Sequence, residues 1–193
     1  MSTGSNRLDR RVFTAAVLAE RGDALIVPGL GAPTWDCAAA GLTGEVLHSW
    51  GGMGLALATS LGLALAQPNR RVLCLTGDGE MMMGLGTLAV VGAEAPANLS
   101  ILVLDNEHFG ETGQQPGLAT NVDLCKIAEG SGIRQTMHVT AMDQVPALTE
   151  LLFKQPGPSM ALSKIALGDY PLVMPERSGP AIAAAFSAEA TAS

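Results

Sequence analysis

Apolar residues along this chain fall into short unbroken runs rather than alternating with polar ones. Runs that end at turn residues cover positions 24–29, 70–79, 99–106 and 159–167, and a weaker run covers 136–139. A strand that is apolar at every position has both faces buried, which is typical of a parallel sheet with helices on each side. We therefore predict that these five segments are the strands of one sheet.

Segments with helical spacing or strong helix formers separate the apolar runs. We expect helices over 8–20, 54–66, 81–91, 123–130 and 143–153, and a short one over 37–40 that Thr34 caps. Because strands and helices alternate, the predicted fold is α/β, a three-layer, doubly wound parallel sheet with helices on both faces. Residues 1–177 are predicted to form a single domain, and the Ala/Ser-rich segment 178–193 to be a frayed tail or a loosely docked helix.

Charge and composition narrow the classes of partner. There are 11 basic and 18 acidic residues, and basic residues adjoin each other only at 10–11 and 70–71, which argues against nucleic acid. The longest apolar run, 51–66, is shorter than the about 20 residues that a membrane-spanning helix needs. The polar N-terminal segment is not followed by an apolar signal region, so we expect no export, no membrane partner and a cytoplasmic location.

The low charge content points to association with another chain. Charged residues make up 15% and hydrophobic residues 48% of the sequence, which leaves little polar surface and predicts a sizeable subunit interface. Cys37, Cys74 and Cys125 are far apart in the sequence and show no metal-ligand spacing. They are predicted to be buried reduced thiols.

The candidate chemistry begins at Gly77, Asp78, Gly79 and Glu80, which follow a predicted buried strand and open a helix. Ligands of open α/β sheets bind at this edge, and the amides of a helix N-terminus receive phosphate oxygens. The carboxylate of Asp78 would repel a bare phosphate, so the pattern predicts a divalent cation between the two. Mg2+ suits this position because it takes oxygen ligands from one or two protein groups and from phosphate.

A second metal ligand is expected at the end of the next strand. Asn106 stands there, 28 residues after Asp78, and offers a neutral amide oxygen. Adjacent parallel strands deliver both side chains to the same edge of the sheet, which makes the pair more specific than either turn alone.

This spacing resembles the signature of the thiamine-diphosphate-dependent enzymes, in which Gly-Asp-Gly is followed 25 to 30 residues later by Asn-Asn. The first Asn of that pair is Asp105 here. The resemblance implies a diphosphate-binding domain that holds thiamine diphosphate and Mg2+. It assigns the metal to Asp78, to the Asn106 side chain and to the backbone carbonyl of His108.

Two glycine-rich segments extend the resemblance. The residues from Trp50 to Gly54 are similar to a family segment whose methionine supports the bent conformation of the cofactor, and Met53 is the matching residue. The loop containing Gly29 and Gly31 matches a loop that touches the diphosphate. The predicted cofactor-binding residues are therefore Gly29, Gly31, Gly51, Gly52, Met53, Gly77, Asp78, Gly79, Glu80, Asn106, His108, Phe109 and Gly110.

Three histidines are candidates for acid–base chemistry, namely His48, His108 and His138. The resemblance places His108 beside the cofactor, and with Met53 it is the predicted catalytic pair. His138 is interpreted as structural, and no role is assigned to His48. The loop 111–114 lies over the predicted metal and can close on a substrate.

Within the family, residues 64–115 are most similar to phosphonopyruvate and sulfopyruvate decarboxylases, especially the separate β subunit of the latter. This similarity implies a lyase that decarboxylates a small 2-oxo acid. Relatives carry Ser-Thr-Gly-Gly-Gln where this chain has 111–115, and Ser-Arg-Glu where it has Thr34, Trp35 and Asp36. The loss of that Arg and the gain of Glu111 leave the specificity for a sulfonate or phosphonate open.

Family members bind the cofactor between two domains, and the other domain supplies a glutamate that activates the pyrimidine ring. This chain has no room for a second α/β domain of about 150 residues. We therefore expect a hetero-oligomer in which an α subunit contributes the glutamate. The open alternatives are a carboligase resembling acetolactate synthase, an oxidoreductase subunit, and a non-catalytic cofactor-binding subunit.

Overall fold

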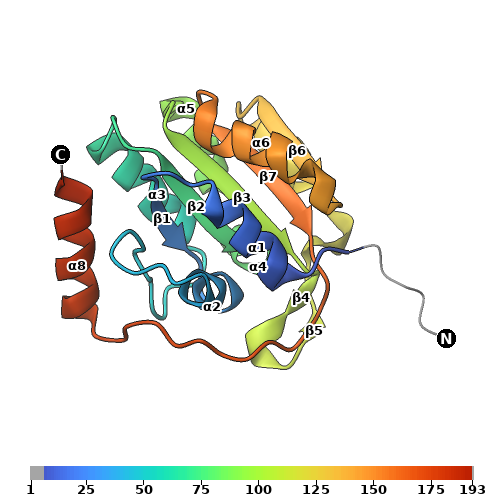
Figure 1. Ribbon diagram of the computed structural model, residues 1–193. Helices are drawn as coiled ribbons and strands as arrows, with labels where there is room; N and C mark the ends of the chain where they lie inside the picture. Colours follow the sequence, from blue (N-terminus) through green and yellow to red (C-terminus); the bar gives the residue numbers. More distant parts are fainter. Residues whose placement is uncertain (1–6, 193) are drawn as a thin grey trace.

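The computed structural model describes residues 7–192, and within them the main sheet has five parallel strands (Figure 1). From one edge to the other, the strands are β1 (Leu25–Pro28), β2 (Val72–Gly77), β3 (Leu99–Asp105), β7 (Ser159–Lys164) and β6 (Gln135–Val139). Each of the five predicted strands is present. The last one ends at Lys164, three residues before its predicted end.

Helices cover both faces of this sheet, as Figure 1 shows. The α-helices are α1 (Arg10–Ala19), α2 (Ala32–Ala39), α3 (Ala56–Ala66), α4 (Asp78–Met83), α5 (Thr87–Glu94), α6 (Leu124–Gly130), α7 (Val145–Thr149) and α8 (Gly179–Thr191). One buried cluster joins α1, α2 and α7 to the sheet, and another joins α3, α5 and α6 to it. The predicted three-layer α/β fold is confirmed.

Neighbouring residues of a single strand belong to different cores. In β2, Val72 and Cys74 pack into the cluster that includes α3 and α5, whereas Leu73 and Leu75 pack into the cluster that includes α1. Successive side chains of a strand point to opposite faces, so a strand covered on both faces must be apolar throughout. This requirement explains the unbroken apolar runs in the sequence.

The predicted single helix over 81–91 is wrong. The chain forms α4 and α5 instead, and the break falls at 84–86. Gly84 lies so close to the backbone of Gly54 that a Cβ at Gly84 would overlap the Gly54 carbonyl oxygen. The break therefore lets the segment around Met53 pack against the end of α4.

The predicted cap at Thr34 is also wrong. Helix α2 begins at Ala32, preceded by Gly31 in the left-handed region at φ 80°, and Pro33 lies in its first turn. Thr34 therefore lies within the helix, and its hydroxyl donates to the carbonyl of Gly29 at 3.0 Å. This bond closes the glycine loop onto the helix that follows it.

The remaining helices differ from prediction mainly at their ends, where assignments commonly shift by one or two residues. The segment 143–153 is a 3-10 turn (Met142–Gln144), α7 and a π-helical turn (Glu150–Lys154) in succession. The predicted loop 111–114 lies between β4 (His108–Phe109) and β5 (Gln115–Pro116), and the two strands pair in a small antiparallel hairpin.

The C-terminal segment returns across the molecule and ends in a helix. From β7 the chain runs in an extended path to α8, which stands beside α3 and β1 (Figure 1). Ile182, Phe186 and Ala190 of α8 are buried, and the latter two pack against Leu25 of β1. None of the helices within residues 7–192 combines the length and the apolar character needed to cross a membrane.

Candidate functional site

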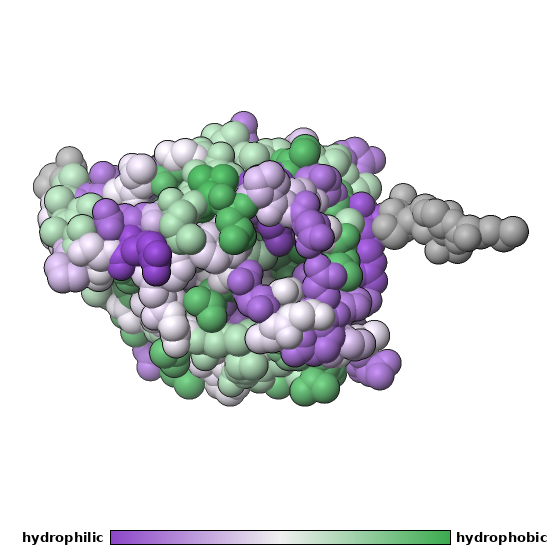
Figure 2. Space-filling model, turned by 90° about the horizontal axis from the view of Figure 1, so that it is seen from below, coloured by the Kyte–Doolittle hydropathy of each residue, from purple (hydrophilic) through white to green (hydrophobic). Residues whose placement is uncertain are grey.

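A cavity of about 710 Å3 lies at the edge where β2 and β3 end. Gly77 is paired with Leu104 in the sheet, so Asp78 and Asn106 follow neighbouring strands at nearly the same level. Figure 2 views the molecule from this side, where apolar patches lie between strongly polar groups. The predicted site residues on the cavity wall are Met53, Gly77, Asp78, Gly79, Glu80, Asn106, Phe109 and Gly110.

Five predicted residues lie off this wall, namely Gly29, Gly31, Gly51, Gly52 and His108. Gly29 and Gly31 nevertheless belong to the same loop as Leu30 and Ala32, and these two residues do line the cavity. The structure thus brings together most of the predicted residues, and their convergence depends on the ends of β2 and β3 and on the segment before α3.

Asp78 is the buried carboxylate at the centre of the site. It is 2% exposed, and its Oδ2 atom has no hydrogen-bond partner among residues 7–192. Burial, and then the nearby Asp105 carboxylate, raises the pKa of Asp78 to about 6. A buried oxygen without a partner is unfavourable, and a cation bound there would satisfy it. The donor set therefore fits a divalent cation that takes oxygen ligands.

Asn106 and His108 form a tight turn directly after β3. The Oδ1 atom of Asn106 accepts from the backbone N–H of His108 at 2.8 Å, and His108 Nδ1 lies 2.9 Å from the Asn106 carbonyl oxygen. Glu107 between them is in the left-handed region at φ 63°. The Asn106 oxygen keeps a second lone pair for a metal, whereas the imidazole of His108 is engaged by its own turn.

Asp105 is compensated by a lysine that the sequence analysis missed. Lys164 Nζ lies 2.6 Å from Asp105 Oδ2 and 2.8 Å from Glu107 Oε1, and Arg7 also pairs with Glu107. Hydrogen bonds from Lys164 and Arg7 lower the pKa of Glu107. The signal in the sequence was the position of Lys164 close to the end of the last predicted strand, where parallel strands share an edge.

The carboxylate of Glu80 is engaged by backbone amides of two other segments. Its carboxylate is buried, which raises its pKa, and it accepts backbone N–H bonds from Leu30 at 2.9 Å, Gly54 at 3.2 Å and Ala56 at 3.3 Å. A Cβ at Gly29 would overlap this carboxylate. Glu80 therefore ties the glycine loop before α2 and the segment before α3 to the start of α4.

Two charged groups shape the mouth of the cavity. Glu111 packs against Gly31, and its Oε1 accepts from Trp35 Nε1 at 3.0 Å. Arg10 also lines the cavity, with its Nε 2.8 Å from Asp36 Oδ2 and its guanidinium 4.6 Å from the centre of the Tyr170 ring. Arg10 was not predictable from the 34–36 segment, where an Arg is missing, because Arg10 reaches the site from α1.

Of the remaining candidate side chains, Met53 and Phe109 line the cavity, whereas His48 and His138 do not. Met53 lies on the cavity wall and is 38% exposed. Phe109 packs on Gly79. His48 is buried away from the cavity, burial lowers its pKa, and its Nδ1 has no partner within the described residues. His138 lies elsewhere, on β6.

Comparison with known proteins is consistent with this geometry. The family described as "Thiamine pyrophosphate enzyme, C-terminal TPP binding domain" matches residues 42–161. The chain is 39% identical over 110 residues to sulfopyruvate decarboxylase subunit beta of Methanothermobacter thermautotrophicus, which is 57% of this chain and 59% of that protein.

Two longer proteins are also similar. Phosphonopyruvate decarboxylase of Streptomyces viridochromogenes is 41% identical over 57% of this chain and 28% of its own length. The acetolactate synthase isozyme 1 large subunit of Escherichia coli is 32% identical over 65% of this chain and 24% of its own length. In each of these three comparisons, the chain spans less than two thirds of the relative.

Proposed function

The chain belongs to the family of thiamine pyrophosphate enzymes through their C-terminal TPP-binding domain, and from that premise we propose that it is the diphosphate-binding subunit of a 2-oxo acid decarboxylase. The proposal rests chiefly on the unpartnered buried oxygen of Asp78 beside Asn106, at the edge of the sheet where ligands bind. Relatives named sulfopyruvate and phosphonopyruvate decarboxylases support the reaction class.

Mg2+ and the cofactor's diphosphate are assigned to the ends of β2 and β3. Asp78, the side chain of Asn106 and the carbonyl of His108 would hold Mg2+, which prefers oxygen ligands. Gly79 and Glu80 lie in the first turn of α4, so their amides face the same edge and suit the diphosphate. A cation held there would offset the repulsion between this diphosphate and the Asp78 carboxylate.

When bound, thiamine diphosphate supplies a carbon nucleophile for the keto group and accepts the electrons released as CO2 leaves. The chain's own residues orient and enclose that chemistry. Met53 offers a polarizable, exposed side chain against which the cofactor rings can pack. The hairpin β4–β5 and its 110–112 turn cover one side of the cavity and limit the access of water.

The charges at the cavity mouth favour an acidic substrate. Arg10 and Arg11 both pair with Asp36, at 2.8 and 3.0 Å, so the three groups together keep one positive charge. Arg10 lines the cavity, where this charge can attract the carboxylate of a small 2-oxo acid. Glu111, which packs against Gly31, and Asp169 also line the cavity and disfavour a second strongly anionic group.

A partner chain completes the proposed enzyme. Large apolar side chains on the cavity wall remain exposed, namely Met53, Met83, Leu167 and Leu172. Exposed apolar groups around a cavity are typical of a surface that another protein covers. An α subunit bound there would supply the pyrimidine-activating glutamate, and the "subunit beta" in the name of one relative supports such an assembly.

A carboligase is the second candidate. The similarity to an acetolactate synthase large subunit favours it, because that relative matches 65% of this chain. The same cofactor site serves both reactions, and they differ only in whether a proton or a second carbonyl compound is added after CO2 leaves.

The test is calorimetric titration of thiamine diphosphate, with and without Mg2+, into this chain alone and into its complex with a co-expressed α subunit. We expect Mg2+-dependent binding to the complex, its loss in Asp78→Asn, and no change in the control Asp143→Asn on the exposed 3-10 turn. Release of CO2 and an aldehyde from 2-oxo acids supports the decarboxylase, and a condensed hydroxyketone product supports the carboligase. Absence of binding in both preparations would contradict the proposal.

A further inference from the structure

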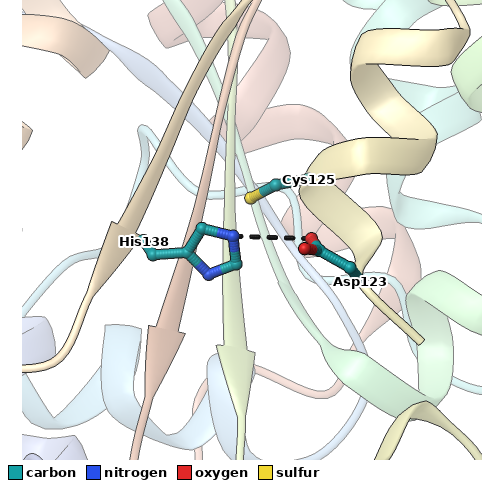
Figure 3. Close-up of side chains that lie close together, drawn as sticks. All are labelled: Asp123, Cys125 and His138. Carbon is teal, nitrogen blue, oxygen red and sulfur yellow. Dashed lines mark ion pairs between the residues drawn. The ribbon is translucent and has the colours of Figure 1, made fainter. Parts of the chain in front are cut away.

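A second cluster of chemically active side chains lies outside the cavity. Asp123, Cys125 and His138 point toward one another, and their ligand atoms all lie within 4.8 Å of each other (Figure 3). Asp123 Oδ1 is 3.4 Å from His138 Nε2. These residues are separate from the wall of the cavity described above, so the cluster needs its own explanation.

Two elements that cross at the edge of the sheet build this cluster. Asp123 is the N-cap of α6 and accepts from the N–H of Lys126 at 3.1 Å, and Cys125 lies two residues further along the chain. His138 is the fourth residue of β6, the edge strand against which α6 packs. The spacing of the three residues in the sequence gives no sign of this cluster, because the histidine comes from a strand and not from the segment of the other two residues.

We propose that Asp123, Cys125 and His138 bind a divalent transition cation of the zinc type, with a fourth position open to water. A carboxylate, a thiolate and an imidazole are the three ligand classes that Zn2+ uses, and three protein ligands with one open position are an established arrangement. Tetrahedral bonds of about 2.0 to 2.3 Å place neighbouring ligand atoms about 3.5 Å apart. The 3.4 Å pair already meets this distance, and the sulfur, within 4.8 Å of both, must move closer for the metal to bind all three.

Exposure and hydrogen bonding in the cluster suit a cation that enters from solvent. The side chains of Asp123 and His138 are 33% and 51% exposed, whereas Cys125 is buried beneath them. The Cys125 sulfur is only weakly held, at 3.9 Å from the carbonyl oxygen of Met137. The thiol can therefore turn toward a metal without the loss of a strong hydrogen bond.

Burial opposes a free thiolate at Cys125, whereas the negative groups around it favour a cation. Burial, and then the carboxylates of Asp123 and Glu129, raises the pKa of the Cys125 thiol to about 11. The same negative groups attract a cation, which replaces the thiol proton and releases it to solvent. Lys126 lies 3.6 Å from Asp123 Oδ2 but is 79% exposed, so its ammonium group can move into water.

The probe for this site is Co2+, which reports thiolate ligation by a charge-transfer band and tetrahedral geometry by its visible bands. Chelator-treated protein is titrated with excess Mg2+ present, so that the oxygen site at Asp78 does not take up the cobalt. We expect one Co2+ per chain, a thiolate band, and displacement of cobalt by Zn2+. Zn2+ should also raise the melting temperature, because a ligand that binds only the folded chain stabilises it.

Three variants locate the ligands. Cys125→Ser should remove the thiolate band, and His138→Gln and Asp123→Asn should each weaken binding at least tenfold. Asn remains a good N-cap, so Asp123→Asn tests ligation without removal of the helix cap. Asp143→Asn, an exposed acid on another element, is the matched control and should bind like the wild type.

Several results would overturn the proposal. A wild-type protein without a thiolate band, or a band that persists in Cys125→Ser, removes the cysteine from the site. If Cys125→Ser does not fold, His138→Gln still decides, because this exposed side chain can change without loss of the core. A folded His138→Gln protein that binds Co2+ within twofold of the wild type would refute the site.

Discussion

Buried carboxylates at the ends of the strands set the chemistry at the residue scale. Asp78, Glu80 and Asp105 are each no more than 4% exposed, yet their surroundings differ. Asp105 pairs with Lys164, Glu80 accepts three backbone amides, and one oxygen of Asp78 has no partner in the described chain. Asp78 is therefore the carboxylate of the three for which a bound cation relieves the cost of burial.

Asp78 should make the stability of the protein depend on pH. Its pKa is raised from 3.8 to about 6, so between these values the folded chain holds a proton that the unfolded chain has released. Without metal, the free energy of unfolding should therefore decrease as pH rises through this window, and level off above about 6. Urea unfolding should show a decrease of about 1 kcal/mol from about pH 5 to pH 7.

The control for this prediction is Asp78→Asn, which cannot ionise. Its free energy of unfolding should lack the decrease that belongs to Asp78, and an unchanged slope would assign the titration to other groups. Mg2+-dependent cofactor binding should show the opposite trend. It strengthens as pH rises through about 6, because the proton and the cation compete for the same carboxylate.

Lys164 should be required because Asp105 is buried. Lys164→Met leaves that carboxylate unpaired, and we expect a loss of about 3 kcal/mol in the free energy of unfolding. In an Asp105→Asn background the side chain at position 105 carries no charge, so Lys164→Met should then have a much smaller effect. Urea unfolding of the four proteins measures the coupling, and effects that add within about 0.5 kcal/mol would show that the pair is not coupled.

Part of this residue pattern was predictable from the sequence. Asp78 and Asn106 follow apolar runs, and parallel strands bring their ends to one edge, so their proximity follows from the fold class. The partners of Asp105 and Glu80 do not follow in this way. They depend on which segments, some 25 to 60 residues apart, come within hydrogen-bonding distance, and local patterns carry no such information.

At the scale of elements, Glu80 holds the site together by joining α4 to the segments before α2 and α3. Glu80→Gln keeps the shape but leaves a single acceptor oxygen, and its NH2 group would face an N–H donor. We expect a loss of about 2 kcal/mol in the free energy of unfolding and weaker cofactor binding by the assembled protein. Urea unfolding and calorimetry measure the two effects.

Glu94→Gln at the exposed end of α5 is the matched control for this substitution and should behave like the wild type. If the free energy of unfolding of Glu80→Gln lies within about 0.5 kcal/mol of the wild-type value, the three hydrogen bonds from backbone amides do not hold the loops in place. Loss of cofactor binding without loss of stability would instead indicate that Glu80 contacts the cofactor.

Element boundaries show where local patterns stop being informative. The strands were predictable because burial on both faces makes each one apolar throughout. The break between α4 and α5 was not predictable. It depends on the close approach of the Gly54 backbone to Gly84, and these two residues are distant in the sequence. The crossing of α6 and β6, which brings Cys125 to His138, likewise depends on packing between elements that are distant in the sequence.

At the scale of the whole molecule, the C-terminal segment lines the cavity and then packs beside strand β1. The extended segment after β7 supplies Leu167, Tyr170 and Leu172 to the cavity wall before the chain reaches α8. Although the tail is rich in Ala and Ser, its buried residues Ile182 and Phe186 are four positions apart, on one face of a helix. This spacing is the sequence signal for a docked helix.

The substitution Phe186→Ala tests whether the tail is an integral part of the domain. It is 7% exposed and packs with Leu25, Leu47 and Leu63, so Phe186→Ala should lower the free energy of unfolding by about 3 kcal/mol. Ser187→Ala, at an exposed position of the same helix, should change it by less than about 0.5 kcal/mol. Because α8 anchors the segment that lines the cavity, Phe186→Ala should also weaken cofactor binding by the assembled protein. A Phe186→Ala protein with wild-type stability and affinity would mean that 178–193 is a separable tail and that the cavity wall is held by β7 alone.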